Sequence, residues 1–235
     1  MEKMKRVFLK LSGEALADKE NGGYQLEVVQ KIALQVKEAA DRGVQVCIVI
    51  GGGNIWRGRT GTEIDRTKSD SIGMLATVMN CLYVSEVFRH EGMRTEIFTP
   101  FICGSITTLF SKDAAVRALE EGKVLFFAGG TGHPYFSTDT GIVLRALELD
   151  ADEILLAKNI DGVYDSDPAV NPDAKKYDTI SVHDVVSGRL GVIDRTASVM
   201  CEENHMPFSV FDLRVSGSIA EALKGHIIGT VVTAD

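Results

Sequence analysis

The sequence contains the stretch Val49-Ile50-Gly51-Gly52-Gly53-Asn54-Ile55-Trp56-Arg57-Gly58, in which three glycines follow an apolar run and precede an arginine. Glycine allows sharp turns and lets a ligand approach bare backbone N–H groups, and converging N–H groups form an anion site. The forked, permanently charged guanidinium of Arg57 suits a phosphate. The stretch matches neither a Walker A loop nor the G-x-G-x-x-G dinucleotide spacing. It therefore predicts a phosphate-handling α/β enzyme of another design, with a tight turn chosen for packing as the alternative.

The composition is that of a globular protein with an acidic surface. The chain has 235 residues, 45% of them hydrophobic and 25% charged, which is enough to bury a substantial core. A net charge of −8 argues against broad binding to nucleic acid or to an anionic membrane. We expect no apolar stretch of the roughly 20 residues that span a bilayer, and the start lacks the features of a signal peptide. These observations predict a cytoplasmic protein.

Four cysteines are spread along the chain, at positions 47, 81, 103 and 201. They show no C-x-x-C pairing, so a zinc site is not expected at these spacings. Apolar neighbours surround most of them. We therefore expect buried, reduced thiols.

Apolar runs and helical periodicity alternate along the sequence. The expected strands are residues 7–11, 44–50, 95–99, 124–128, 153–157, 207–211 and 229–233. The expected helices are residues 26–41, 70–90, 111–121, 138–149, 194–204 and 216–223, and residues 161–178 form an ordered loop rich in Asp, Pro and Asn. This alternation predicts an α/β fold, a single domain over residues 1–235 with a mainly parallel central sheet and helices on both faces.

Small, polar or charged residues follow four of the expected strands. In open sheets of this kind, ligands bind beyond the carboxyl ends of the strands. The four strand-end segments are residues 10–13, 51–53, 129–132 and 157–159. Their agreement predicts one shared site at that edge of the sheet.

Lys10 lies at the end of the first expected strand, beside Ser12 and Gly13. A lysine there can act as a point charge on a transferring phosphoryl group. The alternative is a solvated lysine at a strand edge. A second local concentration of positive charge follows the glycines, at Arg57, Arg59, Arg66 and Lys68. Most of it is expected to be a solvated loop, and Arg57, which lies closest to the glycines, is the candidate ligand.

The segment of residues 130–139 offers glycines, hydroxyl groups, aromatic rings and finally Asp139 at the start of an expected helix. Its backbone and hydroxyl groups can read the polar edge of a base. The helix dipole alone favours a carboxylate at this position, which is the bland interpretation of Asp139. The functional interpretation is that Asp139 orients Lys10 or a metal-bound phosphate. His133 is a weak candidate for a general base.

The segment of residues 158–168 contains the turn signals Asp-Gly and Asp-Pro. A plain loop is one interpretation. The other is a nucleoside site, in which Tyr164 stacks on a base and Asp167 accepts a hydrogen bond from a ribose hydroxyl or a base amine.

These segments, taken in order, closely resemble those of the bacterial uridylate (UMP) kinases of the amino-acid kinase superfamily. The resemblance covers essentially the whole chain and rests on residues 9–16, 51–58, 73–80, 130–139, 161–164 and 167–168. The lysine segment and the triglycine loop are shared by the wider superfamily. The helix at residues 74–80 and the loop at residues 130–137 look specific to UMP kinases.

The resemblance implies transfer of the ATP γ-phosphoryl group to UMP with Mg²⁺, with Lys10 and Asp139 as catalytic residues. It implies an ATP site at Lys10, Leu11, Ser12, Gly13, Gly53, Arg57, Asn159, Tyr164 and Asp167. It implies a UMP site at Gly52, Asp70, Gly130, Thr131, Gly132, His133, Pro134, Tyr135, Phe136 and Ser137. No metal ligand in the protein is assigned. Asp139 matches the carboxylate that organises the family's catalytic lysines.

The family resemblance also implies a homohexamer, activation by GTP and inhibition by UTP. A GTP contact near residues 21–23 is a loose transfer, because that loop varies in length. The second catalytic lysine is either Lys158 or absent, since some relatives carry it at the position of Asn159.

Two rival functions stay open. One is phosphorylation of a carboxylate or carbamate by another member of the superfamily, although no matching substrate-clamping pattern replaces residues 130–137. The other is a nucleotide sensor or oxyanion-storage protein without catalysis, against which the presence of Lys10, Arg57 and Asp139 argues.

Overall fold

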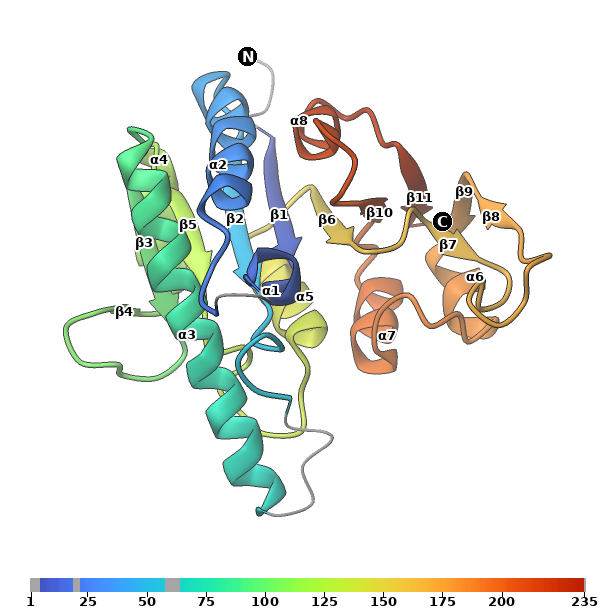
Figure 1. The fold of residues 1–235 in the computed structure, drawn as a ribbon, viewed down its shortest axis with the longest axis horizontal. Helices are drawn as coiled ribbons and strands as arrows, with labels where there is room; N and C mark the ends of the chain where they lie inside the picture. Colours follow the sequence, from blue (N-terminus) through green and yellow to red (C-terminus); the bar gives the residue numbers. More distant parts are fainter. Residues whose placement is uncertain (1–4, 19–21, 58–63, 235) are drawn as a thin grey trace.

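The computed structural model describes residues 5–18, 22–57 and 64–234 (Figure 1). Asn21, Gly58 and Arg59, which were considered above, lie outside the described residues. The strands are β1 (Arg6–Leu11), β2 (Gln45–Ile50), β3 (Thr95–Thr99), β4 (Thr108–Leu109), β5 (Val124–Phe127), β6 (Glu153–Lys158), β7 (Val163–Tyr164), β8 (Lys176–Tyr177), β9 (Thr179–Ser181), β10 (Phe208–Asp212) and β11 (Gly229–Thr233). The helices are α1 (Gly13–Leu16), α2 (Leu26–Asp41), α3 (Arg66–His90), α4 (Lys112–Glu120), α5 (Thr138–Glu148), α6 (Val182–Ser187), α7 (Arg195–Glu203) and α8 (Ser218–Leu223).

A nine-stranded sheet runs through the molecule in the order β4-β3-β5-β2-β1-β6-β10-β11-β9. The neighbours pair in parallel except for β10 and β11, which are antiparallel. Strands β7 and β8 form a separate antiparallel pair. The prediction of a mainly parallel central sheet is confirmed.

Helices cover both faces of the sheet and create two hydrophobic cores (Figure 1). Successive side chains of a strand point to opposite faces, so Val7, Leu9 and Leu11 join the core under α2, α3 and α8. Phe8 joins the second core, with residues of α4, α5, α6 and α7. By the same alternation Lys10 faces α5, the helix that begins with the site's carboxylate.

Helix α3 begins four residues before the start that the sequence predicted. Asp65 caps it by accepting hydrogen bonds from the backbone N–H groups of Thr67 at 3.0 Å and Lys68 at 3.2 Å. The polar first turn carries no apolar periodicity, which is why the pattern placed the start at Asp70.

Among the described helices, α3 is long and apolar enough to cross a membrane by length and composition. The sequence expectation of no such stretch was therefore wrong for this helix. Half of its most apolar window is buried in the fold, where the helix packs against β2, β3 and β5. This packing is that of a core helix.

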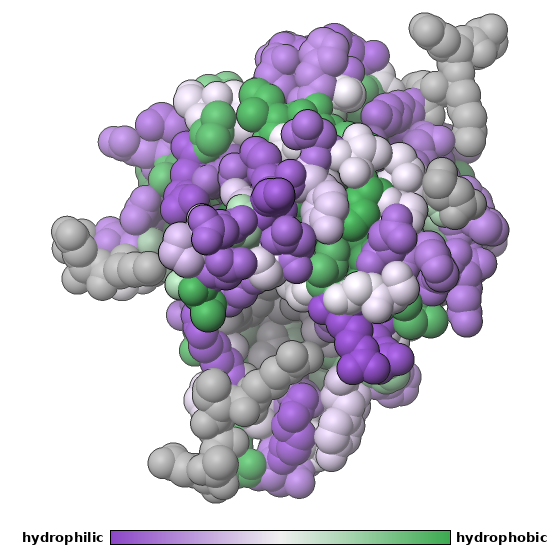
Figure 2. All heavy atoms as spheres, turned by 90° about the vertical axis from the view of Figure 1, so that its right-hand side faces the viewer, coloured by the Kyte–Doolittle hydropathy of each residue, from purple (hydrophilic) through white to green (hydrophobic). Residues whose placement is uncertain are grey.

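Several short elements, including α1, β4, α6 and β9, were not predicted, because two to six residues carry too little periodicity. The expected loop at residues 161–178 contains β7 and β8. The face that the C-terminal part of the chain presents is mostly polar, interrupted by a band of apolar residues (Figure 2). Three cysteines are buried as free thiols, whereas Cys103 is partly exposed.

Candidate active site

The site is built where four adjacent parallel strands end. Strands β5, β2, β1 and β6 are neighbours in the sheet, and Lys10 of β1 pairs with Val49 on one side and Leu156 on the other. All four strands therefore end at one edge. The segments that follow them in the sequence meet there and line one row of cavities.

Two lysines and one carboxylate form the charged centre of this edge. The Lys10 ammonium donates to the Asp139 carboxylate in the first turn of α5, and both side chains are mostly buried, at 17% and 15% exposure. Lys158, at the end of β6, donates to the carbonyl oxygen of Val192. Burial raises the pKa of Asp139, but the charges of Lys10 and Lys158 outweigh it, so that the pKa lies below its usual value.

The pKa of Lys158 is also lowered, but for a lysine this shift disfavours the charged form. Burial lowers the pKa of its ammonium, and repulsion from Lys10 adds to this effect, against the attraction of Asp139 and Asp194. A buried lysine that shifts its pKa readily is a common feature of functional sites. The charges thus couple Lys158 to the Lys10–Asp139 pair, although sequence left its role open.

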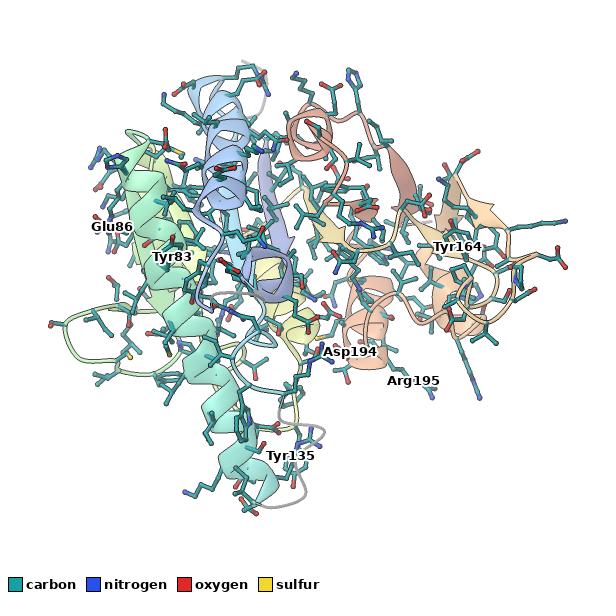
Figure 3. The ribbon with its side chains drawn as sticks, in the orientation of Figure 1. Tyr83, Glu86, Tyr135, Tyr164, Asp194 and Arg195 are labelled. Atoms are coloured by element: carbon teal, nitrogen blue, oxygen red, sulfur yellow. The ribbon has the colours of Figure 1, made fainter. Side chains whose placement is uncertain are left out.

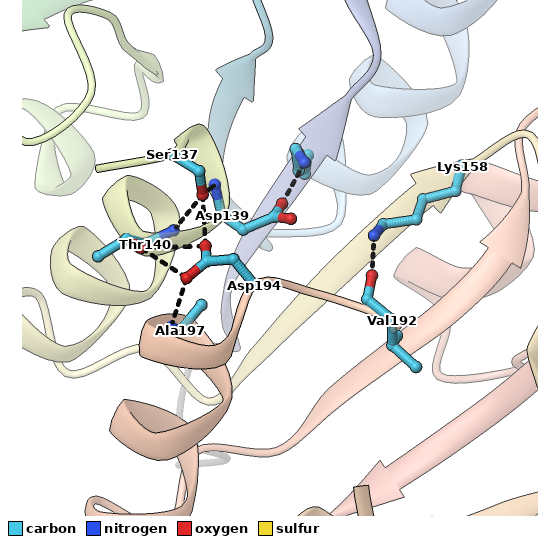
Figure 4. Close-up of polar contacts among 8 residues, drawn as sticks. Ser137, Asp139, Thr140, Lys158, Val192, Asp194 and Ala197 are labelled. Atoms are coloured by element: carbon cyan, nitrogen blue, oxygen red, sulfur yellow. Dashed lines mark hydrogen bonds and ion pairs between the residues drawn. The ribbon is translucent and has the colours of Figure 1, made fainter. Parts of the chain in front are cut away.

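A cluster of helix caps fixes the position of Asp139 (Figure 4). Ser137 caps α5 by accepting from the N–H groups of Asp139 at 3.0 Å and Thr140 at 3.3 Å. The Ser137 hydroxyl donates in turn to the carboxylate of Asp194, which caps α7 through Ala197 N–H at 3.1 Å. The Thr140 hydroxyl donates to the same carboxylate at 3.0 Å. Asp194 therefore ties α5 to α7 beneath the charged centre.

The first of three cavities lies between the triglycine loop, the start of α3 and the loop after β5. Asp70 lines it, and its Oδ2 accepts from Arg66 Nε at 2.9 Å and from the Tyr135 N–H at 2.8 Å. Trp56 also lines it, and its Nε1 donates to Ser69 Oγ at 2.9 Å. The full lining is Gly52, Gly53, Trp56, Arg66, Ser69, Asp70, Gly73, Met74, Thr77, Gly130, Thr131, His133, Phe136, Ser137 and Thr138.

The second cavity is lined by both lysines of the charged centre, but not by Asp139, and it is next to the other two. It is lined by Lys10, Ser12, Gly13, Glu14, Gly51, Gly53, Ala157, Lys158 and Asn159. The third is lined by Lys158, Ile160, Gly162, Val163, Tyr164, Asp165, Ser166, Asp167, Pro168, Gly188, Arg189, Leu190, Gly191, Val192 and Val210. Because Gly53 lines both the first and the second cavity, and Lys158 both the second and the third, the three cavities lie next to one another in a row.

The glycines of the triglycine loop differ in how much space surrounds them. A Cβ on Gly52 would lie 2.8 Å from the carbonyl oxygen of Gly73, so this residue is required for packing on α3. A Cβ on Gly53 would meet only the Glu14 side chain, at 3.0 Å. The packing alternative therefore accounts for Gly52, whereas Gly53 leaves its backbone open to a ligand.

The structure brings most predicted site residues to this row and leaves six outside the linings. Asp139 is one of them, although it is ion-paired with Lys10, which lines the second cavity. The Leu11 side chain is fully buried in the core, and Gly132, Pro134 and Tyr135 do not line the first cavity. Arg57 is exposed and ion-paired with Glu14.

Tyr135 and Tyr164 lie at opposite sides of the site, with Asp194 between them in Figure 3. Tyr135 is 65% exposed, and its ring lies under the Arg66 guanidinium at 5.3 Å. The hydroxyl of Tyr164 donates to Asp161 at 2.8 Å. Each tyrosine thus has a polar neighbour at the edge of its cavity.

Sequence reasoning missed several residues of the row. Arg66 was assigned to a solvated loop, but it lines the first cavity, and Trp56, Ser69 and Thr77 were not considered. Asp194 was read only as the start of a helix. A basic residue four positions before Asp70 was the available signal for Arg66, whereas nothing local marked Asp194, whose partners are more than 50 residues away.

Comparison with known proteins identifies the family of this chain. The family model described as the amino acid kinase family matches residues 5–212. The chain belongs to this family.

Solved structures of several kinases match the chain over almost its whole length. A UMP kinase from Bacillus anthracis is 35% identical, with a TM-score of 0.93 over 98% of this chain and 96% of the other. A UMP kinase from Ureaplasma parvum is 33% identical, with a TM-score of 0.92 over 98% of this chain and 99% of the other. An isopentenyl phosphate kinase at 22% identity and a TM-score of 0.74, over 97% of this chain and 100% of the other, shares the fold.

Proposed function

We propose that this amino acid kinase family member is a UMP kinase that transfers the γ-phosphoryl group of ATP to UMP, giving ADP and UDP. One observation carries the proposal. The three cavities form a row, and the middle one holds Lys10, Lys158 and the triglycine backbone, between two spaces of different character. Such a row suits two nucleotides whose phosphates meet at the centre. The UMP kinases at 33–35% identity support UMP as the acceptor.

We assign the first cavity to UMP and the third to ATP. Gly52, Asp70 and residues 130–137 would receive UMP, with Asp70 at the ribose. Tyr164 and Asp167 would receive the nucleoside of ATP. Residues 10–13, Gly53 and Asn159 would hold the ATP phosphates, and Arg57 would join them by exchanging Glu14 for phosphate.

The chemistry requires positioning and charge neutralisation. A phosphate oxygen of UMP forms a bond to the γ-phosphorus of ATP, while the bond from that phosphorus to the bridging oxygen of ADP breaks. The acceptor oxygen is already ionised, so no general base is needed. Lys10 and Lys158 would neutralise charge on the transferring group, and Asp139 would hold Lys10 in place.

Mg²⁺ is the metal that this reaction implies. Within the described ranges, no group of three or more His, Cys, Asp and Glu side chains is arranged to hold a metal ion. This fits Mg²⁺ that arrives on ATP, because Mg²⁺ usually keeps waters and substrate phosphates as ligands. Bound in that way, it would offset the negative charge of the phosphates.

We extend the proposal to assembly, regulation and cellular role. The outer face of α3 exposes Ile72, Leu75 and Met79, at 38%, 50% and 56% exposure. An apolar helix face of this kind favours a subunit interface, which supports an oligomer, and we propose that the oligomer is a homohexamer. Activation by GTP, inhibition by UTP, a cytoplasmic location and a role in pyrimidine nucleotide biosynthesis complete the proposal.

The test is detection of ADP with purified protein, Mg²⁺-ATP and one acceptor at a time. The acceptors are UMP, CMP, glutamate, aspartate and isopentenyl phosphate. We expect rapid turnover with UMP and slow turnover with the others, and a further rise when GTP is added. Preference for another acceptor, or ATP binding without turnover on any of them, would contradict the proposal.

A further inference from the structure

We propose that Thr77 and Asn80, on the inner face of α3, are positioning residues that hold the two glycine loops of the active site in register. The inference rests on the proposed function, because it concerns how the two phosphates are placed. It also gives a role to the segment of residues 73–80, which the sequence marked as distinctive but which no catalytic step uses.

Asn80 holds the triglycine loop. Its side chain is fully buried, and its Nδ2 donates to the carbonyl oxygen of Gly51 at 2.7 Å and to Asn54 Oδ1 at 2.8 Å. Its Oδ1 accepts from the Tyr24 hydroxyl at 2.6 Å. One side chain therefore grips the loop at both ends of the glycine run, and Tyr24 fixes the orientation of its amide.

Thr77 holds the loop after β5. Its hydroxyl is 2.7 Å from the Gly129 N–H, from which it accepts, and 2.7 Å from the carbonyl oxygen of Met74, to which it donates. Thr77 is 5% exposed. Gly129 has a φ of 79°, so the chain turns sharply at this residue. The bond therefore fixes the point at which the loop that lines the first cavity departs from the sheet.

These contacts belong to one face of one helix. Gly73, Thr77 and Asn80 are spaced by four and three residues, which places them on the same side. A Cβ on Gly52 would lie 2.8 Å from the carbonyl oxygen of Gly73, so the triglycine loop lies close against the helix at this point. The two loops, which follow the paired strands β2 and β5, are thus both bonded to one helix beyond the sheet. Their relative position, and with it the distance between the two nucleotides' phosphates, is fixed by α3.

Thr77→Val is the main test, because valine keeps the shape but cannot accept the Gly129 N–H. A buried N–H without a partner is costly, so the loop after β5 should shift. We expect the KM for UMP to rise about tenfold, while the KM for ATP stays within about twofold, since ATP does not use that loop. Thr77→Ser keeps the hydroxyl and should restore the KM for UMP.

Ser85→Ala is the matched control. Ser85 is a buried hydroxyl of the same helix, 2% exposed, and donates only within the helix, to Leu82 at 3.2 Å. It should change the thermal stability as Thr77→Val does but neither KM. The inference is wrong if Thr77→Val leaves the KM for UMP within twofold of wild type, or if Ser85→Ala raises it equally.

Asn80→Asp tests the triglycine loop, because a carboxylate cannot donate to Gly51. We expect kcat to fall at least about tenfold, since the displaced loop lines the central cavity. Tyr24→Phe removes only the hydroxyl that orients the amide and should lower kcat about threefold in a fully folded protein. Unchanged kcat in Tyr24→Phe, together with unchanged kcat in any folded Asn80→Asp, would overturn the role of Asn80.

The failure of the inference and that of the proposed function can be told apart. Trp56 is the only tryptophan of the chain and lines the first cavity, so its fluorescence reports UMP binding without turnover. A wild-type protein that neither binds UMP nor makes UDP would contradict the proposed function. A wild-type protein that does both, beside variants with normal KM values and normal UMP titrations, would contradict only the positioning roles.

Discussion

The two ends of the cavity row rest on different supports. The cavity with Asp70 is built on a 25-residue helix and on loops whose backbone is bonded to buried side chains. The cavity with Tyr164 is lined mostly by connecting segments and a two-residue strand, with only Lys158 of β6 and Val210 of β10 from the central sheet, and Asp165, Asp167 and Pro168 are exposed. The difference teaches that the structure determines the acceptor position more tightly than the donor position. Changes on the acceptor side should therefore cost more than comparable changes on the donor side.

The largest loss of activity is expected from a change in the central cavity, which lies between the acceptor side and the donor side. Lys10→Ala removes the ammonium at the phosphates and should lower kcat by about two to three orders of magnitude. The measurement is single-turnover formation of UDP, with circular dichroism to show that the protein is folded. Near-normal turnover would show that the centre is not where the two sides meet. Lys5→Ala, at an exposed lysine paired with Glu153, is the control.

The acceptor side comes next. Asp70→Asn keeps the shape but replaces the carboxylate that accepts from Arg66 and from the Tyr135 N–H. Bonds to a charged group contribute about 1.5–3 kcal/mol, so the KM for UMP should rise at least about tenfold. The KM for ATP should not change, and Asp113→Asn, at an exposed position of α4, should change neither. An equal rise in both constants would break the distinction between the two sides.

The shifted pKa of Lys158 predicts an alkaline limit of activity. Burial lowers this pKa from its ordinary value of 10.5. Lys158 therefore loses its charge at a lower pH than an exposed lysine does, and kcat should fall in that pH range. In the same pH range Lys158 is still protonated in the unfolded chain but loses its proton in the folded protein. The contribution of Lys158 to the free energy of unfolding therefore rises with pH. Loss of activity without unfolding is therefore expected. Lys158→Arg stays charged and should move the limit upward, and an unmoved pH–rate profile would contradict this role.

The smallest effect is expected on the donor side. Tyr164→Ala should raise the KM for ATP about fivefold, the low end of base stacking at about 1 kcal/mol, and leave the KM for UMP unchanged. Tyr164→Phe, which loses only the bond to Asp161, should behave as wild type. A larger loss than that of Asp70→Asn would reverse the comparison between the two sides.

Much of the fold could be predicted because its signals are local. The run before the glycines, the lysine after the first strand and the helical periodicities gave the α/β class and the functional edge of the sheet. Pairings of side chains could not be predicted, since they depend on strand order. The Lys10–Lys158 neighbourhood exists because β6 pairs beside β1 across more than 140 positions of sequence.

The contacts of single residues follow the same rule. Arg57 was chosen for its closeness to the glycines, and the sequence did not reveal its ion pair with Glu14, 43 positions away. Arg66 was judged solvated because no pattern showed that α3 begins there. The sequence indicated that Asp194 starts a helix, but it did not reveal the hydrogen bonds that join Asp194 to Ser137 and Thr140 at the start of α5.

The sequence by itself determined the longer strands and helices, and that glycines, lysines and carboxylates follow the strands at one edge. Hydrophobic periodicity and the freedom of glycine act within a few residues, so they can be read directly. Only the tertiary structure decided that one face of α3 carries both glycine loops and that one buried carboxylate lies between two lysines. These arrangements depend on contacts between elements far apart in the chain, and the energies of such contacts exist only once the sheet has assembled.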